Sequence, residues 1–398
     1  MELGPAVLAV VGTWLASRVA VLVVSLLGAR AVSNPPVGQV PDLVGLWDHW
    51  DAGLFAKVAE YGYLSPAYSD PTEVDFPGMP LAMRVVHPLV GDWVVAGMLV
   101  SLIAGLLASA ALWRLAVDDH SVPAGGVGGV GSPGVGGSTG IVAEDLDRGR
   151  RAVLLLVCSP YAVFLFAGYS EALFLAFATT AWVAARRQRW ALAGLCAAGA
   201  TGTRIIGVAL VAGLVVEYAV QRWRARDELP LRSWRTAVEL GWLVVVPLAP
   251  LVAFAAYFQA RTGHWDAYTR AMRDHWQRGV DWPWAGLETT VRAALAPGQG
   301  TAYQVFWCAE LAAVAIGVLL TAVLLSQARW GEATYVGVCT LIISCSTYWA
   351  SGVRAVLVWF PLYVLLARRP RLLAPCLWVG APAAAVFVLA FTRGVWVD

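Results

Sequence analysis

The sequence predicts an all-α, polytopic membrane protein, and its composition and the arrangement of its apolar residues are the two observations that predict this. Of the 398 residues, 59% are hydrophobic and 14% are charged, whereas soluble domains have roughly 25% charged residues. The apolar residues gather in runs that can cross a hydrocarbon core of about 30 Å, which takes roughly 20 helical residues. Helices are favoured over a closed barrel because the runs lack the alternating pattern of barrel strands.

About eleven transmembrane helices are expected from these runs. They lie near residues 5–33, 93–117, 151–167, 169–185, 189–203, 205–221, 236–258, 304–326, 333–350, 354–367 and 372–392. The first run has no basic segment before it and no small-residue cleavage site after it, so we expect it to be retained as a helix. The chain, 1–398, then forms one transmembrane domain with three longer loops, 34–92, 118–150 and 259–303.

Arginine clusters indicate the orientation, because cytoplasmic loops of membrane proteins carry an excess of Lys and Arg. With eleven helices, the clusters all fall on one face, which we assign to the cytoplasm; they lie at residues 148–151, 186–189, 222–235 and 368–371. The opposite, exoplasmic face receives loops 34–92 and 259–303. It also receives the short turns that hold Tyr169, Glu171, Arg204 and Arg354. Polar residues from distant parts of the chain are therefore expected on one side.

The cytoplasmic loop 118–150 contains a stretch of Gly, Pro, Ser and Val at residues 121–140. This composition cannot form a packed core and predicts a flexible linker. Its glycine spacing does not indicate a phosphate-binding loop, because no strand precedes it and no Lys-Ser/Thr follows it.

The six cysteines lie inside or at the edges of apolar runs, with no Cys-x-x-Cys pair and no His/Cys cluster. This pattern argues against a disulfide framework and against a metal site. We expect no cofactor, no metal and no nucleic-acid partner; the lipid bilayer is the expected surrounding.

An acidic and aromatic cluster, Trp47-Asp48-His49-Trp50-Asp51, opens the polar part of loop 34–92. From residue 47 to 63, apolar residues recur at three- and four-residue spacing, which predicts an amphipathic helix along the membrane interface. Asp48 fits the N-cap of this helix and Asp51 its third position, so both acids have a structural explanation. The alternative is chemical: an apolar surround raises the pKa of a carboxyl toward the range of a general base.

The loop 259–303 is aromatic and amphipathic, and it includes His275 and the element Trp282-Pro283-Trp284. Such a segment could cover a bound acceptor, or it could anchor the chain at the lipid headgroups. Tryptophan-rich elements favour anchoring for residues 282–284. We consider His275 as a residue that binds substrate.

Four parts of the chain, in order, resemble the GPI mannosyltransferase II family, also called the PIG-V family. The matching segments are His49-Trp50-Asp51-Ala52-Gly53-Leu54-Phe55 with Phe76-Pro77-Gly78-Met79-Pro80-Leu81, Cys158-Ser159-Pro160-Tyr161-Ala162-Val163-Phe164 with Ala167-Gly168-Tyr169-Ser170-Glu171-Ala172-Leu173-Phe174, Thr203-Arg204-Ile205-Ile206-Gly207, and Ser351 to Pro361. The chain departs from the family where Ile205-Ile206 replaces a polar pair, which puts in doubt that the acceptor side of the site is the same.

The resemblance implies a GT-C type glycosyltransferase, a multi-helix membrane enzyme that takes mannose from polyprenyl-phosphate-mannose on the exoplasmic side. In that class an acid of the first exoplasmic loop is held to be the catalytic base, and the family match falls on Asp51. Asp48 stays a second catalytic candidate. The acceptor is a hydroxyl of a glycolipid, a glycan or a protein, and the sequence leaves that choice open.

The chemistry of inverting transfer fits a single carboxylate, because one base takes the acceptor proton while the lipid phosphate leaves from the opposite face of the sugar. Arg204 and Arg354 are candidates to bind that phosphate, since planar guanidinium groups pair with phosphodiesters and charges near membrane depth are costly. The alternative is that they snorkel or pair with an acid such as Glu171. Trp50, Tyr169 and Glu171 are further candidates to contact substrate.

Two other classes stay open on the sequence alone. A transporter or lipid flippase would line a path with the same acids and arginines, although no internal repeat and no acid central to a span is evident. A non-catalytic membrane subunit is the third possibility.

Only one of the 28 basic residues is a lysine, and with abundant Ala, Gly and Val this indicates a GC-rich genome and a bacterial plasma membrane, where a GPI acceptor is not expected.

Overall fold

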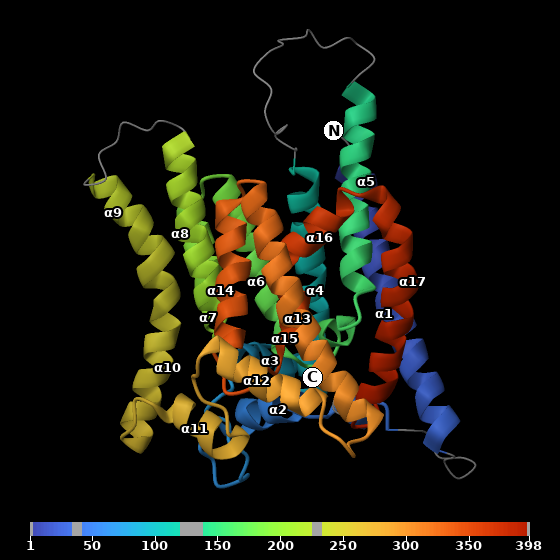
Figure 1. Cartoon of the computed structure of the whole chain (residues 1–398), viewed down its shortest axis with the longest axis vertical. Helices are drawn as coiled ribbons and strands as arrows, with labels where there is room; N and C mark the ends of the chain where they lie inside the picture. Colours follow the sequence, from blue (N-terminus) through green and yellow to red (C-terminus); the bar gives the residue numbers. More distant parts are fainter. Residues whose placement is uncertain (1–2, 34–41, 120–137, 225–232, 396–398) are drawn as a thin grey trace.

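The computed structural model describes residues 3–33, 42–119, 138–224 and 233–395, and in these ranges every regular element is a helix (Figure 1). The all-α prediction is thereby confirmed. Five helical segments have the length and apolar composition to cross a membrane: Val7–Arg30, Trp93–Val117, Trp234–Thr262, Thr301–Ser326 and Pro370–Phe391. The count of eleven spans stays a prediction.

The helices follow the predicted apolar runs closely. Those that form the bundle are α1 (Leu3–Ser33), α4 (Trp93–Val117), α5 (Ser138–Val157), α6 (Ser170–Arg186), α7 (Trp190–Thr201), α8 (Gly207–Arg224), α9 (Trp234–Leu240), α10 (Val246–Thr262), α13 (Thr301–Ser326), α14 (Trp330–Ser344), α15 (Gly352–Val358), α16 (Phe360–Ala367) and α17 (Pro370–Phe391). A π-helical segment, η3 (Gly241–Val245), joins α9 to α10 without a break.

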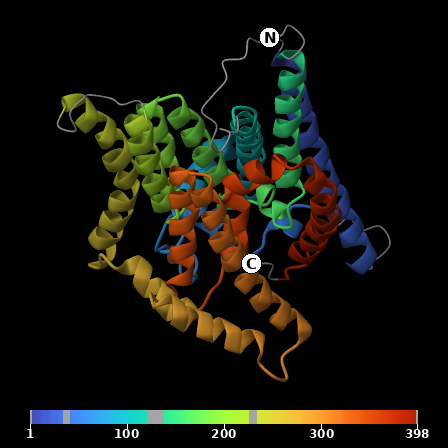
Figure 2. The same cartoon turned by 45° about the horizontal axis from the view of Figure 1, so that its top comes forward.

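Shorter helices lie across one end of the bundle (Figure 1). They are the 3₁₀ segment η1 (Gly45–Trp47), α2 (Asp51–Tyr61), α3 (Gly78–Val90), α11 (Ala267–Trp276) and α12 (Pro283–Ala294), and η2 (Ala162–Leu165) precedes α6. In the turned view of Figure 2, α11 and α12 form an arm that runs from α10 to α13. The two predicted exoplasmic loops, 34–92 and 259–303, therefore meet at the same end.

Small residues allow the inner helices to pack closely. In α7, a Cβ added to Gly194 would lie 1.9 Å from the carbonyl oxygen of Trp242, so only glycine permits this approach to the π-helical segment. In α4, a Cβ at Gly97 would lie 3.1 Å from the Cα of Gly168. Close approach of small residues is the usual way in which membrane helices pack. The second contact brings the start of α6 against α4.

The other end of the bundle carries the arginine clusters. Asp119, just after α4, accepts a hydrogen bond of 2.6 Å from Arg368, and it lies 3.5 Å from Arg329 and 3.9 Å from Arg186. Glu332 pairs with Arg186 at 2.9 Å. Arginines from two of the predicted clusters, Arg186 and Arg368, are therefore joined at this end through their contacts with Asp119.

Several predicted boundaries differ from the structure. The run predicted at 151–167 is divided between the end of α5 and η2, the run at 333–350 ends with α14 at Ser344, and the run at 354–367 is divided into α15 and α16. The loop 118–150 is shorter than expected, because α5 begins at Ser138; residues 120–137, most of the predicted linker at 121–140, lie outside the described residues. The interfacial helix expected over 47–63 is divided into η1 and α2. The division follows from Trp50, whose φ of 55° interrupts the helix.

The division changes the roles of the acids and tryptophans. Trp50 is the N-cap residue of α2 and is 41% exposed, and Asp51 is the first residue of the helix. Asp48 follows η1 and does not cap α2, so the capping interpretation of this residue is wrong. Trp47 is 1% exposed and its ring lies 4.8 Å from that of Phe166, which places it in the protein core and not at the lipid interface.

Candidate functional site

Asp51 is held at the centre of the end that carries the short helices. Its backbone N–H donates a hydrogen bond of 3.3 Å to the hydroxyl of Tyr169, at the start of α6. Its carboxyl Oδ2 lies 2.9 Å from Nη1 of Arg354, and the side chain keeps 24% of its surface exposed. The first loop is thereby fixed to two distant parts of the chain, and Asp51 stays accessible.

Tyr169 and its neighbours are positioned by α4. The hydroxyl of Ser101 donates to the carbonyl oxygens of Ala167 at 2.7 Å and of Tyr169 at 3.3 Å. Together with the Gly97–Gly168 approach, these bonds fix the turn that leads into α6. Glu171 follows in the first helical turn and is fully buried. The turn therefore aims a buried carboxylate at the same region as Asp51.

Arg354 joins the two carboxylates. It lies in α15, which begins after Ser351 with a φ of 64° and whose Gly352 N–H donates 2.8 Å to Glu310. The Arg354 side chain is 6% exposed. Its Nε and Nη2 lie 2.6 and 2.5 Å from Oε1 of Glu171. The guanidinium carbon also lies 5.1 and 5.0 Å from the ring centroids of Phe164 and Tyr169, within cation–π range.

Arg204 completes the cluster from the turn between α7 and α8. Its Nη1 donates to Glu171 Oε1 at 2.6 Å and to Ser170 Oγ at 2.9 Å. Two acids and two arginines therefore form one ion cluster with zero formal net charge, which we define as Asp51, Glu171, Arg204 and Arg354. Because the two arginines share one carboxylate oxygen, they are close enough to contact a single phosphate together.

Asp75 is a site residue that sequence reasoning missed. It is 7% exposed, and among the described residues its Oδ2 has no hydrogen-bond partner. Burial and the nearby charge of Asp51 raise its pKa well above the usual range, while Arg354 acts in the opposite direction. The one available signal was an acid directly before a Phe-Pro pair in a loop that already held Asp51.

The remaining predicted residues lie around the ion cluster and not in it. Trp50 adjoins Asp51 in the chain and is partly exposed. Asp48 lies against the start of α2, where its Oδ1 would be 2.8 Å from a Cβ at Gly53; within the described ranges it joins none of the ion pairs. His275 lies apart, on α11.

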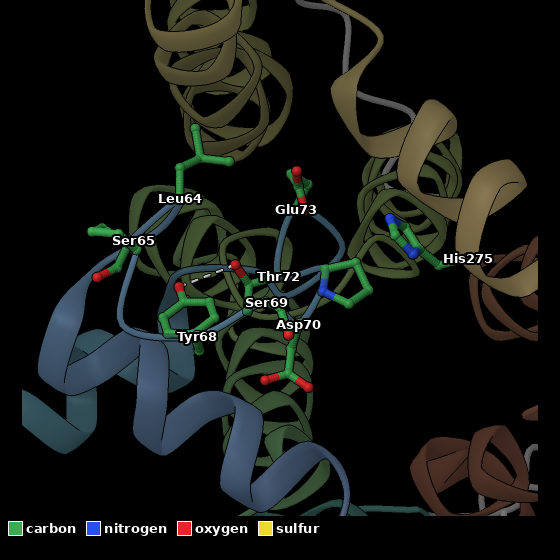
Figure 3. A pocket seen from close by; sticks show the side chains of 10 residues that line it. Leu64, Ser65, Tyr68, Ser69, Asp70, Thr72, Glu73 and His275 are labelled. Atoms are coloured by element: carbon green, nitrogen blue, oxygen red, sulfur yellow. Dashed lines mark hydrogen bonds between the residues drawn. The ribbon is translucent and has the colours of Figure 1, made fainter.

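His275 lines a cavity of about 360 Å³ between α11 and the loop that joins α2 to α3 (Figure 3). The opposite wall consists of loop residues: Leu64, Ser65, Pro66, Tyr68, Ser69, Asp70, Pro71, Thr72 and Glu73. Asp70 of this wall forms an ion pair of 2.6 Å with Lys57 of α2. The cavity is therefore polar and belongs to the same end of the molecule as Asp51.

The fold defines the class of protein: an integral, multi-pass membrane protein with the GT-C fold. ArnT from Cupriavidus metallidurans, whose structure was solved bound to undecaprenyl phosphate, is similar with a TM-score of 0.51 at 18% sequence identity. The similarity covers 98% of this chain and 65% of ArnT. At this identity the likeness is evidence for the fold.

The relatives in sequence are GPI alpha-1,6-mannosyltransferases. The chain is 34% identical to the Homo sapiens GPI alpha-1,6-mannosyltransferase 2 over 204 residues, which are 47% of this chain and 36% of the human protein. It is 30% identical to the Mus musculus protein over 233 residues, 56% of this chain and 41% of that one. The matches thus span less than half of these relatives.

No profile of a known protein family matches the chain. The resemblance to GPI mannosyltransferase II is confirmed by these relatives, and a glycosyltransferase is the class of enzyme that they support.

Proposed function

We propose that this chain is a membrane glycosyltransferase that moves mannose from polyprenyl-phosphate-mannose to a hydroxyl acceptor, with inversion, on the exoplasmic side of a bacterial plasma membrane. The observation that carries the proposal is the ion cluster, which places an accessible acid of the first loop directly on a buried arginine. The names of the relatives support mannose transfer. The undecaprenyl phosphate bound to ArnT supports a lipid-linked donor.

In the proposed reaction the donor phosphate binds Arg354 and Arg204. A phosphodiester oxygen competes with Asp51 for Arg354, and guanidinium groups pair with phosphate at least as well as with carboxylate. The Asp51 carboxylate is then released from its ion pair. Binding of the donor therefore also activates the base, because the phosphate replaces Asp51 as the partner of Arg354.

The transfer itself is a single displacement. The acceptor hydroxyl oxygen attacks C1 of mannose and forms the new C–O bond, while the bond from C1 to the phosphate oxygen breaks. The electron pair stays on that oxygen, giving polyprenyl phosphate, and Asp51 takes the hydroxyl proton. The arginines stabilise the charge that develops on the leaving phosphate.

The test is an assay of the purified protein with radiolabelled polyprenyl-phosphate-mannose and an extract of cell envelopes as the acceptor source. Label that moves to the extract reports transfer, and free labelled mannose reports hydrolysis by water. We expect Asp51→Asn to lower both rates by at least about 100-fold, the range that general-base catalysis contributes. Asp48→Asn is expected to have a smaller effect.

A matched control is Glu288→Gln, which changes an exposed acid on α12 that pairs with its helical neighbour Arg292. This variant should keep wild-type rates. Wild-type transfer by Asp51→Asn would refute the role of this residue. Uptake or flipping of lipid by reconstituted protein, with no label transferred, would favour the transporter class instead.

The proposed side of the site has a separate test. In a Cys308→Ala background, a cysteine at the exposed Thr289 of α12 should react in intact cells with a maleimide that cannot cross membranes. A cysteine at Gln188, in the exposed turn between α6 and α7, should react only after the cells are opened. The reverse result would place Asp51 in the cytoplasm.

A further inference from the structure

The polar cavity between α11 and the α2–α3 loop is not used by the proposed reaction of the ion cluster. Its volume of about 360 Å³ lies at the small end of the range for ligand sites. Figure 3 shows hydroxyl and carboxyl groups on the loop side and the imidazole of His275 approaching from α11. A ligand there would contact two segments that are far apart in the sequence.

The loop wall is preorganised. Tyr68 donates a hydrogen bond of 2.5 Å to the carbonyl of Gly62, and its hydroxyl lies 3.2 Å from that of Thr72. The ion pair between Lys57 and Asp70, at 2.6 Å, fixes the same loop to α2. A wall with internal bonds of this kind needs little ordering when a ligand binds, which lowers the cost of association.

Two groups of the cavity keep their hydrogen-bonding capacity for a ligand. Glu73 is half-buried and His275 is exposed, and within the described part of the chain neither side chain makes a hydrogen bond. The lining carboxylates are Asp70 and Glu73, and Asp70 is paired with Lys57 outside the cavity, so these three groups carry a formal charge of −1. This charge disfavours a phosphate, so the lipid-phosphate donor does not fit here. Hydroxyl groups of an uncharged sugar do fit, because they donate to carboxylates and pair with imidazole.

Two segments of the chain connect the cavity to the ion cluster. Asp70 of the cavity pairs with Lys57, and Lys57 follows Asp51 by six residues of α2, which corresponds to about 9 Å along the helix axis at 1.5 Å per residue. Glu73 precedes the buried Asp75 by two residues. The charges that act on Asp75 include Asp51 and Arg354 from the ion cluster and Glu73 and Asp70 from the cavity. Asp75 is therefore near charged groups of both.

Resting on the proposed transferase function, we infer that this cavity binds the acceptor, and that the acceptor is an uncharged, hydroxyl-rich glycan headgroup held by Glu73 and His275. One sugar in the cavity would extend a hydroxyl toward Asp51, the base that takes its proton. Glu73 and His275 are then residues that determine acceptor specificity, while Arg204 and Arg354 serve the donor.

The test uses the same radiolabelled donor and measures the ratio of transfer into the cell-envelope extract to hydrolysis by water. The double variant Glu73→Gln, His275→Gln should lower this ratio by about tenfold or more, because each change removes a hydrogen bond to the acceptor. The extract concentration at half-maximal transfer should rise by a similar factor. The matched control is the double variant Glu288→Gln, His264→Gln, which changes an acid and a histidine at the same end but outside the cavity.

A second variant tests the cavity without changing Glu73 or His275. Ser69 is exposed and lines the cavity, so Ser69→Trp should fill the cavity without disturbing the core, and it should lower the same ratio. An unchanged ratio in both variants would overturn the inference while leaving the proposed function intact. If wild-type protein gives neither transfer nor hydrolysis, the proposed function fails, and the inference fails with it.

Discussion

Replacing Glu171 by glutamine should destabilise the protein by about 3–5 kcal/mol, the usual cost of removing one partner from a buried ion pair. Glu171 is fully buried, and its Oε1 accepts one charge-assisted hydrogen bond from Nε of Arg354 and one from Nη1 of Arg204, and it forms an ion pair of 2.5 Å with Nη2 of Arg354. At about 1.5 kcal/mol each, the low end for bonds to charged groups, the two hydrogen bonds give about 3 kcal/mol, which is the lower limit of that range. Glutamine keeps the shape and removes the charge that neutralises both arginines. Arg354 keeps its pair with Asp51, which favours the lower half of the range.

The measurement is the free energy of unfolding in mixed micelles titrated with sodium dodecyl sulfate and followed by tryptophan fluorescence. Glu288→Gln is the control, because the Glu288 side chain is 62% exposed, and breaking an exposed pair changes stability by less than about 1 kcal/mol. A loss below about 1 kcal/mol in Glu171→Gln, equal to the control, would refute the reasoning that this carboxylate holds the cluster together.

Three further predictions follow from single contacts. Arg354→Lys should raise the KM for the donor and lower transfer at least about tenfold in the radiolabel assay, because one ammonium cannot contact Asp51 and Glu171 as a planar guanidinium does; wild-type kinetics would contradict this. Asp119→Asn should cost about 1.5–3 kcal/mol in the unfolding titration, the range for a hydrogen bond to a charged group, since the buried Asp119 accepts such a bond from the partly exposed Arg368; an effect near zero would show that the other acids suffice. The raised pKa of Asp75 means that its protonated form stabilises the fold and that this contribution is lost as pH rises above the unfolded value of about 3.9. The stability of Asp75→Asn relative to wild type should therefore increase from pH 4 to pH 8, by about 1.4 kcal/mol for each unit of pKa shift, and a constant difference would contradict the shift.

The bundle could be predicted because a membrane helix is specified locally. The run predicted at 93–117 is the helix Trp93–Val117 in the structure, since length and apolar composition alone decide such a segment. The arginine clusters were placed together for the same reason, as each lies at the end of a run. The core position of Trp47 could not be predicted in this way. A tryptophan beside an acid has the same local pattern at a lipid interface as in a core, and only Phe166, from another part of the chain, decides between them.

The residues of the candidate site could be predicted from the sequence, but the ion pairs between them could not. Sequence order placed Glu171, Arg204 and Arg354 on one side of the membrane, yet two interpretations of the arginines stayed open. The structure shows the ion pairs with Glu171, and phosphate binding remains part of the proposal. Asp75 was missed because its burial depends on long-range packing: Tyr63 bonds its carbonyl, and the ring of the adjacent Phe76 lies 5.0 Å from that of Phe254 in α10.

The ion pair between Asp51 and Arg354 bears directly on the order of events in the proposed reaction. A carboxylate that is paired with a buried guanidinium is a poor base, because the pair stabilises its charged form against protonation. In the ion cluster two positive charges balance two negative ones, so a phosphodiester can enter favourably only by taking a carboxylate's place. Glu171 is fully buried and pairs with both arginines, whereas Asp51 is 24% exposed and pairs with Arg354, so in the proposed reaction Asp51 is the group that the phosphate displaces. In the proposed reaction the carboxylate therefore becomes free to act as the base only when the donor is bound.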